Sequence, residues 1–388
     1  YRALANISPS YDAVFGGVFY PGGTITSLSN RSVHWERSEQ MDLGFDLGLL
    51  NNRFSLELDY YRRDTKDMLV TVDVPASVGL TPVETNVGAV RNSGVDFTVK
   101  WEDSLKDFRY GIRLTGTTIK NEVISLGGKR IASGDIGAGK SVQMTEEGKP
   151  IKYFYGYNVI GIFQNEAQIK DYNERAAAAT GNAGQQYQNN VGPGDLIYED
   201  VDGDGYITAN DRKDLGSPTP KFIGGLGISA SWKGFDLSMV WAGAAGFSIY
   251  WGATTGYNAA STEWGSTIAQ RVAENHYFYN PENPDDPRTN INAKYPRMAY
   301  IDGYVQNRHG NTTLWLYKGD YIKLKNLSLG YTLPKNWVSK IAMQNARIYV
   351  SAENLLTITG FEGQDPESAT GMGYSPFRTI AIGANITF

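Results

Sequence analysis

Apolar and polar residues alternate along much of this chain. This alternation restricts the possible folds of the chain more than any other feature of the sequence. In the run 39–50 it places on one face Met41, Leu43, Phe45, Leu47 and Leu49, and on the other Gln40, Asp42, Gly44, Asp46 and Gly48. Because successive side chains of a β-strand point to opposite faces, the run predicts a strand with one apolar and one polar face. Asn51 and Asn52 predict a tight turn, since Asn tolerates positive φ, and the pattern returns at 54–60.

The pattern recurs in further runs, separated by connections that are alternately short and long. These runs occupy about 95–101, 108–114, 226–232, 235–241, 327–333, 348–352 and 380–388. The short connections are 51–52, 102–107, 233–234 and 334–345, and the long ones are roughly 64–92, 120–220, 243–313 and 357–376. A membrane-spanning barrel with short periplasmic turns and long outer loops has this alternation. The sequence therefore predicts an all-β transmembrane antiparallel β-barrel wall of about ten strands, with a periplasmic C-terminus and long extracellular loops.

The length of the runs separates a membrane barrel from a soluble β protein. A tilted strand needs roughly nine to eleven residues to cross a bilayer, and the runs reach that length. Aromatic residues near strand ends suit the two interfaces: Tyr60, Trp101, Trp232, Trp241 and Tyr331. The alternative is a soluble sandwich or propeller, whose strands average about five or six residues. No run of eighteen apolar residues is present, which excludes a transmembrane helix but not a barrel.

The number of strands leaves two arrangements open. Ten strands could close a small barrel, although the loops are large for one. An open sheet would leave two unpaired strand edges in hydrocarbon, where unsatisfied backbone groups are costly. Either the ten strands close on themselves, or further strands lie outside this sequence. The chain starts at Tyr1 with no leader in view, so either a signal peptide was removed or the sequence begins within a longer protein.

Charge and residue content exclude two other classes of function. The net charge is -5, with 36 basic and 41 acidic residues and no basic face, so nucleic acid is not an expected partner. The three histidines, His34, His276 and His309, are far apart, and no nucleophile or metalloprotease motif is present. We therefore do not expect an enzyme.

The segment 200–211 has the spacing of an EF-hand-like calcium loop. The expected ligands are Asp200, Asp202, Asp204, the carbonyl of Tyr206, Thr208 directly or through water, and Asp211. Such loops offer Ca²⁺ six to eight oxygens, and a glycine at the sixth position, here Gly205, permits the sharp turn. Asp211 stands where Glu is usual, which predicts modest affinity. We expect a structural Ca²⁺ that stiffens the extracellular excursion 120–220; the alternative is a solvated acidic loop.

The long connection 243–313 is rich in aromatic residues. The candidates for contact with a substrate or a lid protein are Tyr250, Trp251, Tyr257, Trp264 and Tyr277. Flat rings stack on sugars and peptides and anchor interfaces. The alternative, which we favour, is that these rings pack inside a long ordered loop.

Several short motifs together resemble the SusC/RagA family of TonB-dependent transporters. They are Trp35-Glu36-Arg37-Ser38-Glu39-Gln40, Asp59-Tyr60-Tyr61-Arg62-Arg63-Asp64, Gly161-Ile162-Phe163, Gly216-Ser217-Pro218-Thr219-Pro220, Tyr321-Ile322-Lys323-Leu324-Lys325-Asn326 and Ser351-Ala352-Glu353-Asn354-Leu355. Each motif alone is weak, but they cover nearly all of the chain in the family's order.

The resemblance implies that residues 1–388 form the C-terminal portion of a barrel of about 22 strands in the outer membrane of a Gram-negative, Bacteroidetes-like bacterium. The plug and the TonB box are not part of this sequence. The resemblance also implies active import of an oligomeric nutrient, a glycan or an oligopeptide, driven by the TonB–ExbB–ExbD complex and assisted by a SusD-like lipoprotein. The alternative is a passive pore or a surface-exposed structural or adhesion barrel.

Overall fold

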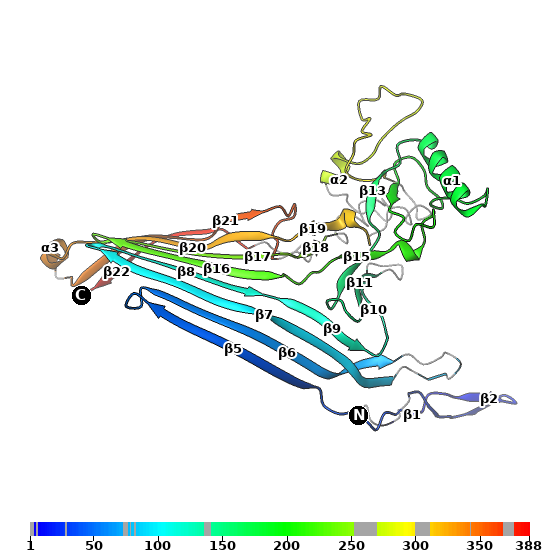
Figure 1. Cartoon of the computed structure of the whole chain (residues 1–388), viewed down its shortest axis with the longest axis horizontal. Helices are drawn as coiled ribbons and strands as arrows, with labels where there is room; N and C mark the ends of the chain where they lie inside the picture. The colour runs from blue at the N-terminus through cyan, green and yellow to red at the C-terminus, as the bar shows by residue number, and fades with distance from the viewer. Residues whose placement is uncertain are drawn as a thin grey trace.

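The computed structural model describes residues 4, 7–27, 29–72, 77, 79–80, 83–135, 141–251, 270–298, 311–341, 343–367 and 376–388. Its largest element is a ten-stranded antiparallel sheet, which we call the wall (Figure 1). The strands follow the order β22 (Thr379–Thr387), β21 (Asn345–Thr359), β20 (Tyr321–Thr332), β17 (Phe235–Ala245), β16 (Phe222–Trp232), β8 (Phe108–Thr118), β7 (Val83–Leu105), β6 (Phe54–Val72) and β5 (Arg37–Leu49), and β9 (Lys120–Leu126) pairs with β7.

The register of the wall aligns the apolar residues of neighbouring strands in continuous rows. One row crosses eight strands through Leu47, Leu56, Val99, Leu114, Leu226, Trp241, Leu324 and Leu356. Six residues further along β16, beside the turn between β16 and β17, another row carries the aromatic residues Phe108, Trp232, Phe235 and Tyr331. Because a slip of one residue would turn every side chain to the other face, these rows show that the register follows the alternation.

The apolar side chains face outward rather than into a protein core. Leu43 is 71% exposed, Phe45 54% and Leu58 40%. A soluble sandwich would bury this face against a second sheet. Exposure of these residues suits the hydrocarbon of a bilayer and confirms the fold expected from the alternation. No helix in the described part of the chain is long and apolar enough to cross a membrane.

Short and long connections gather at opposite ends of the wall (Figure 1). The expected turn after β5 is confirmed by the positive φ of Asn51 (56°) and Asn52 (62°). The link between β20 and β21 holds the short helix α3 (Lys335–Val338), and the C-terminus lies at this same end. We call it the short-turn end, and the opposite one the long-loop end.

One expected long connection, 64–92, is mostly strand. β6 runs on to Val72 and β7 begins at Val83, so the two continue their pairing beyond the apolar face. A bulge between Thr65 and Met68 shifts the register there, and this break in alternation hid the continuation of β6 from the sequence reading. The extension is stabilised by β9 and by a core of Val70, Val90, Val123 and Leu126.

The excursion 120–220 is folded. It contains a four-stranded sheet of β10 (Ile131–Asp135), β11 (Ser141–Thr145), β12 (Tyr153–Gly156) and β15 (Lys213–Gly216). A second unit joins the hairpin of β13 (Val159–Ile162) and β14 (Leu196–Tyr198) to the helix α1 (Glu166–Thr180). Its core consists of Phe163, Ile169, Ala176, Tyr187 and Ile197.

The later connection, between β17 and β20, adds smaller elements. These are β18 (Ser248–Tyr250), which pairs with β19 (Leu316–Lys318), and the short helix α2 (Gln270–Glu274). At the N-terminal side, β1 (Ile7–Ser8) pairs with β4 (Thr24–Ile25), and β2 (Ala13–Phe15) pairs with β3 (Val18–Tyr20).

A charge placed on the apolar face should harm the wall more than the same charge on the polar face. Leu114→Arg should destabilise the folded protein in lipid by about 2–4 kcal/mol, because Arg near the bilayer midplane loses its hydration. Thr115→Arg, one residue further on the same strand but on the other face, should change stability much less. Denaturant titrations of the intact protein in lipid vesicles measure both values. Equal losses would contradict the assignment of the two faces.

Candidate functional site

The acidic loop brings together three of its expected metal ligands. One carboxylate oxygen of each of Asp200, Asp202 and Asp204 lies within 4.8 Å of the others. The carboxylate of Asp200 accepts the backbone N–H groups of Gly203 (2.7 Å) and Gly205 (2.9 Å), which curls the chain around it. Burial, together with the neighbouring carboxylates, raises the pKa of Asp202. The donors are hard oxygens concentrated at one point, which is the set that Ca²⁺ prefers.

Two further features close this loop. Gly205 has φ +91°, and a Cβ there would lie 2.7 Å from Cβ of Ala179 in α1, so a side chain is excluded by both strain and contact. Asp211 is fully buried, and its carboxylate accepts the backbone N–H groups of Val201 (2.8 Å) and Thr208 (2.6 Å). Asp211 therefore ties the two ends of the loop to each other by hydrogen bonds.

The aromatic residues expected to contact a substrate or a lid protein do not form one site. Tyr250 packs beside the buried core formed by α2 and the segment 313–315. Trp251 borders a groove next to α2, and Tyr277 lies in the wall of a larger cavity. Tyr257 and Trp264 lie outside the described residues.

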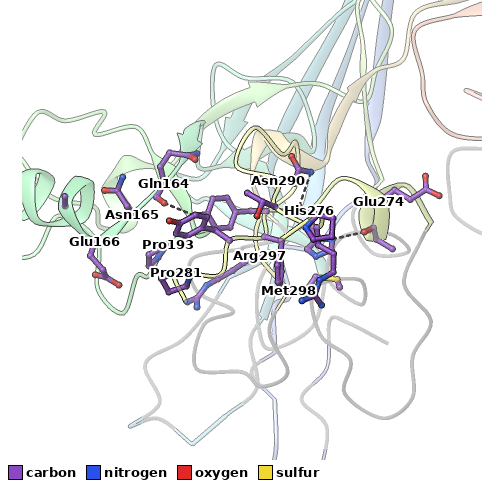
Figure 2. A pocket seen from close by; sticks show the side chains of 18 residues that line it. Gln164, Asn165, Glu166, Pro193, Glu274, His276, Pro281, Asn290, Arg297 and Met298 are labelled. Atoms are coloured by element: carbon purple, nitrogen blue, oxygen red, sulfur yellow. Dashed lines mark hydrogen bonds between the residues drawn. The ribbon is translucent and has the colours of Figure 1, made fainter. Parts of the chain in front are cut away.

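A cavity of about 1300 Å³ separates two parts of the long-loop end (Figure 2). One side is formed by residues 164–167, at the start of α1, and the other by the segment 273–298. Tyr277 is 4% exposed, and its hydroxyl donates to the carbonyl of Gln164 at 2.6 Å, which joins the two sides. The lining mixes amides, charged groups, prolines and aromatic rings, so it can accept a large ligand with many hydrogen-bonding groups.

An ion pair holds the same two sides together. Arg297 donates through Nε and Nη2 to the two carboxylate oxygens of Asp195, both at 2.9 Å, and Asp195 is fully buried. Such a two-pronged bond fixes both the distance and the orientation of its partners. Gly194, with φ +90°, makes room for it, because a Cβ there would lie 2.6 Å from both Arg297 and Tyr277. The cavity is therefore preformed between tied segments.

The polar face of the wall carries paired charges toward the short-turn end. Arg347 on β21 donates to both carboxylate oxygens of Asp236 on β17, across the intervening strand β20. The same guanidinium donates to the hydroxyl of Ser328 on β20 (3.4 Å), so Arg347 joins three strands of the wall.

A second network, which the sequence reading did not find, lies where β20 reaches the long-loop end. The ammonium of Lys323 donates to both carboxylate oxygens of Asp365 (2.6 and 2.7 Å) and to Glu367 (2.7 Å). Lys325 and the hydroxyl of Tyr321 donate to Glu367 as well. Burial alone would raise the pKa of Glu367, but the two lysines outweigh it and bring that pKa to about 2. Breaking a buried pair of this kind by removing one partner costs about 3–5 kcal/mol.

These carboxylates belong to a segment that we call the strap, residues 360–367. Its other anchor is Phe361, which is buried with Ile249 and Tyr317 and whose ring centroid lies 5.2 Å from that of Trp251. The only sequence sign of the network is a pair of lysines, 323 and 325, near the start of β20. Their partners lie about forty residues further on, and only the fold brings them together.

Comparison with known proteins places this geometry in a family. A model of the TonB dependent receptor-like β-barrel matches residues 4–355. TonB-dependent receptor P3 of Formosa agariphila is 31% identical over the whole chain, and TonB-dependent receptor SusC of Bacteroides thetaiotaomicron is 22% identical over 96% of it. The chain spans 38% and 34% of the length of these two relatives.

A solved structure of the RagAB peptide transporter has the same fold. It superposes on the whole chain with a TM-score of 0.70 at 23% identity, and the chain covers 39% of it. The resemblance to SusC and RagA expected from the sequence motifs is confirmed, and the open sheet is part of a larger barrel wall. This chain belongs to the TonB-dependent receptor-like β-barrel family.

Proposed function

We propose that the intact protein imports an oligomeric nutrient across the outer membrane, with energy from the TonB–ExbB–ExbD complex. The observation that carries this proposal is a wall with an apolar and a polar face whose long-loop end holds a preformed cavity of about 1300 Å³. A wall that served only as a scaffold would need no such cavity. The long-loop end then faces the outside of the cell, where a SusD-like lipoprotein covers it.

The proposed substrate is a glycan or an oligopeptide. The mixed lining of the cavity can satisfy the many donors and acceptors of either polymer. The structural relative RagAB is described as a peptide transporter, which supports the second choice. Trp251, Tyr277 and the cavity residues would contact the substrate first, and the polar face of the wall would line its path.

Energy dependence separates active import from a passive pore. Uptake of a labelled casein digest and of labelled oligosaccharides should be lost when the gene for this protein is deleted, and equally when tonB is deleted. A passive pore needs no energy source, so uptake that persists without TonB would exclude the active mechanism. A strain that lacks an unrelated TonB-dependent receptor serves as the control.

We further propose that Asp200, Asp202 and Asp204, with the carbonyl of Tyr206 and with Thr208 and Asp211, hold a structural Ca²⁺. The clustered carboxylates repel one another, and a divalent cation would remove that repulsion. An extracellular position supports the proposal, since even a weak loop is filled at the calcium concentrations found there.

Calorimetric titration of the intact protein in detergent with Ca²⁺ should give a Kd of about 10⁻⁴–10⁻³ M, the range of extracellular calcium modules. Asp202→Asn with Asp204→Asn should weaken binding at least tenfold, because two ligand charges are lost. Asp214→Asn is the matched control, since Asp214 is bound to Lys149 instead. The absence of binding heat up to about 10 mM Ca²⁺, well above that range, would show that the loop is merely solvated.

A further inference from the structure

The strap lies on the polar face of the wall, at the long-loop end. Ile322 and Ile358 are 43% and 54% exposed on the apolar face. Lys323 follows Ile322 on β20, so its side chain points to the opposite face, where it is 1% exposed beneath the strap. The strap therefore folds over the long-loop end of the wall onto its polar face.

The hydrogen-bonding capacity of Lys323 is used entirely by the strap. An ammonium group has three donors, and all three bonds of Lys323 go to Asp365 and Glu367. If the strap left the wall, a buried ammonium would lose all its partners, and the two carboxylates would lose theirs. A small displacement of the strap, which breaks these bonds while Lys323 is still buried, is therefore unfavourable. Release requires the whole strap to move, so that water can solvate the ammonium and both carboxylates.

The docked strap completes a groove. Its residues 362–364 form one side of a groove of about 460 Å³, and Trp251 with α2 forms the other. Arg271 on α2 joins the two sides, because it donates to the backbone carbonyl of Glu362 (3.3 Å) and its guanidinium lies 3.5 Å over the ring of Trp251. The carboxylate of Glu362 also accepts from Lys294 (2.5 Å). The groove combines an indole with guanidinium, carboxylate and amide groups, which suits the polar backbone of an oligomer.

We propose that Lys323 is a latch: it keeps the strap docked, and the docked strap forms a groove that takes one unit of the oligomeric substrate. Lys323 touches no substrate in this arrangement and is a positioning residue. The part played by the groove in transport rests on the proposed function, whereas the docking of the strap by Lys323 does not.

The wall provides a matched control for the latch. Arg347 makes the same kind of two-pronged bond with Asp236, on the same face, but it joins β21 to β17 near the short-turn end and touches no part of the strap. Removal of Arg347 therefore breaks an ion pair of the wall without releasing the strap.

The position of the strap can be read with a single thiol, because this chain contains no cysteine. Pro366 is buried between the two latch carboxylates, so Pro366→Cys reports when the strap is undocked. In the intact protein in outer membranes, labelling by a membrane-impermeant maleimide should be slow in the Pro366→Cys background. Adding Lys323→Met should raise the labelling rate at least tenfold, and adding Arg347→Met should leave it within twofold.

A charge-neutral latch tests whether the ion pair, and not a general loss of structure, sets the position of the strap. The double change Lys323→Met with Asp365→Asn removes one charge of each sign and keeps the bond from Lys325 to Glu367, so labelling should return to within about threefold of the background. Heat-modifiable migration of every variant on gels shows that its barrel is folded.

An unchanged labelling rate in Lys323→Met, or equal acceleration in Arg347→Met, would overturn the latch.

For the groove, the apparent KM of uptake of the labelled casein digest or oligosaccharide should rise at least fivefold in folded Lys323→Met while Vmax stays within twofold. A fall in Vmax at constant KM would overturn the role in capture. If neither probe is taken up even by the unmodified protein, the proposed function fails while the labelling result still decides the latch.

Discussion

The requirement that every backbone N–H and C=O be paired within hydrocarbon governs this structure. No water is available there to replace a missing hydrogen bond, so a spanning sheet must continue from strand to strand. The wall meets this requirement through an antiparallel ladder from β5 to β22, in which each inner strand pairs on both sides. The two outermost strands pair on one side within this chain, as expected for part of a larger barrel. The alternation of side chains follows from the same ladder, because its two faces meet different solvents.

Different forces shape the two ends of the wall. Turns at the short-turn end are fixed locally, by residues such as Asn51 and Asn52 that accept positive φ. The long-loop end has instead a set of small hydrophobic cores, of which two lie within single excursions and a third joins the β6–β7 extension to β9. Small cores stabilise weakly, so polar bonds between excursions contribute much of their mutual order.

Those polar bonds connect residues that are far apart in sequence, and they surround the places where a ligand fits. The pair Arg297–Asp195 and the bond from Tyr277 to Gln164 hold the sides of the large cavity. Lys323 holds the strap beside the smaller groove. Buried ion pairs add little net stability, because desolvation offsets much of the attraction. These pairs lie beside the large cavity and the smaller groove. We infer that they maintain the shape of the long-loop end rather than its stability.

The sequence by itself determined most of the wall: the alternating stretch of each long strand, the apolar face and the end of the wall at which the chain finishes. A period of two is a local property. The residues next to Leu43, Leu56 or Leu114 are therefore enough to assign which face of the sheet each side chain occupies. Sequence also indicated the acidic loop, because Asp200, Asp202 and Asp204 are close along the chain. It could not place Asp195 against Arg297 or Lys323 against Asp365, since the intervening loops have no period that fixes where they return. Only the tertiary structure decided these contacts, because the burial that makes a charged partner necessary exists only once the loops have folded.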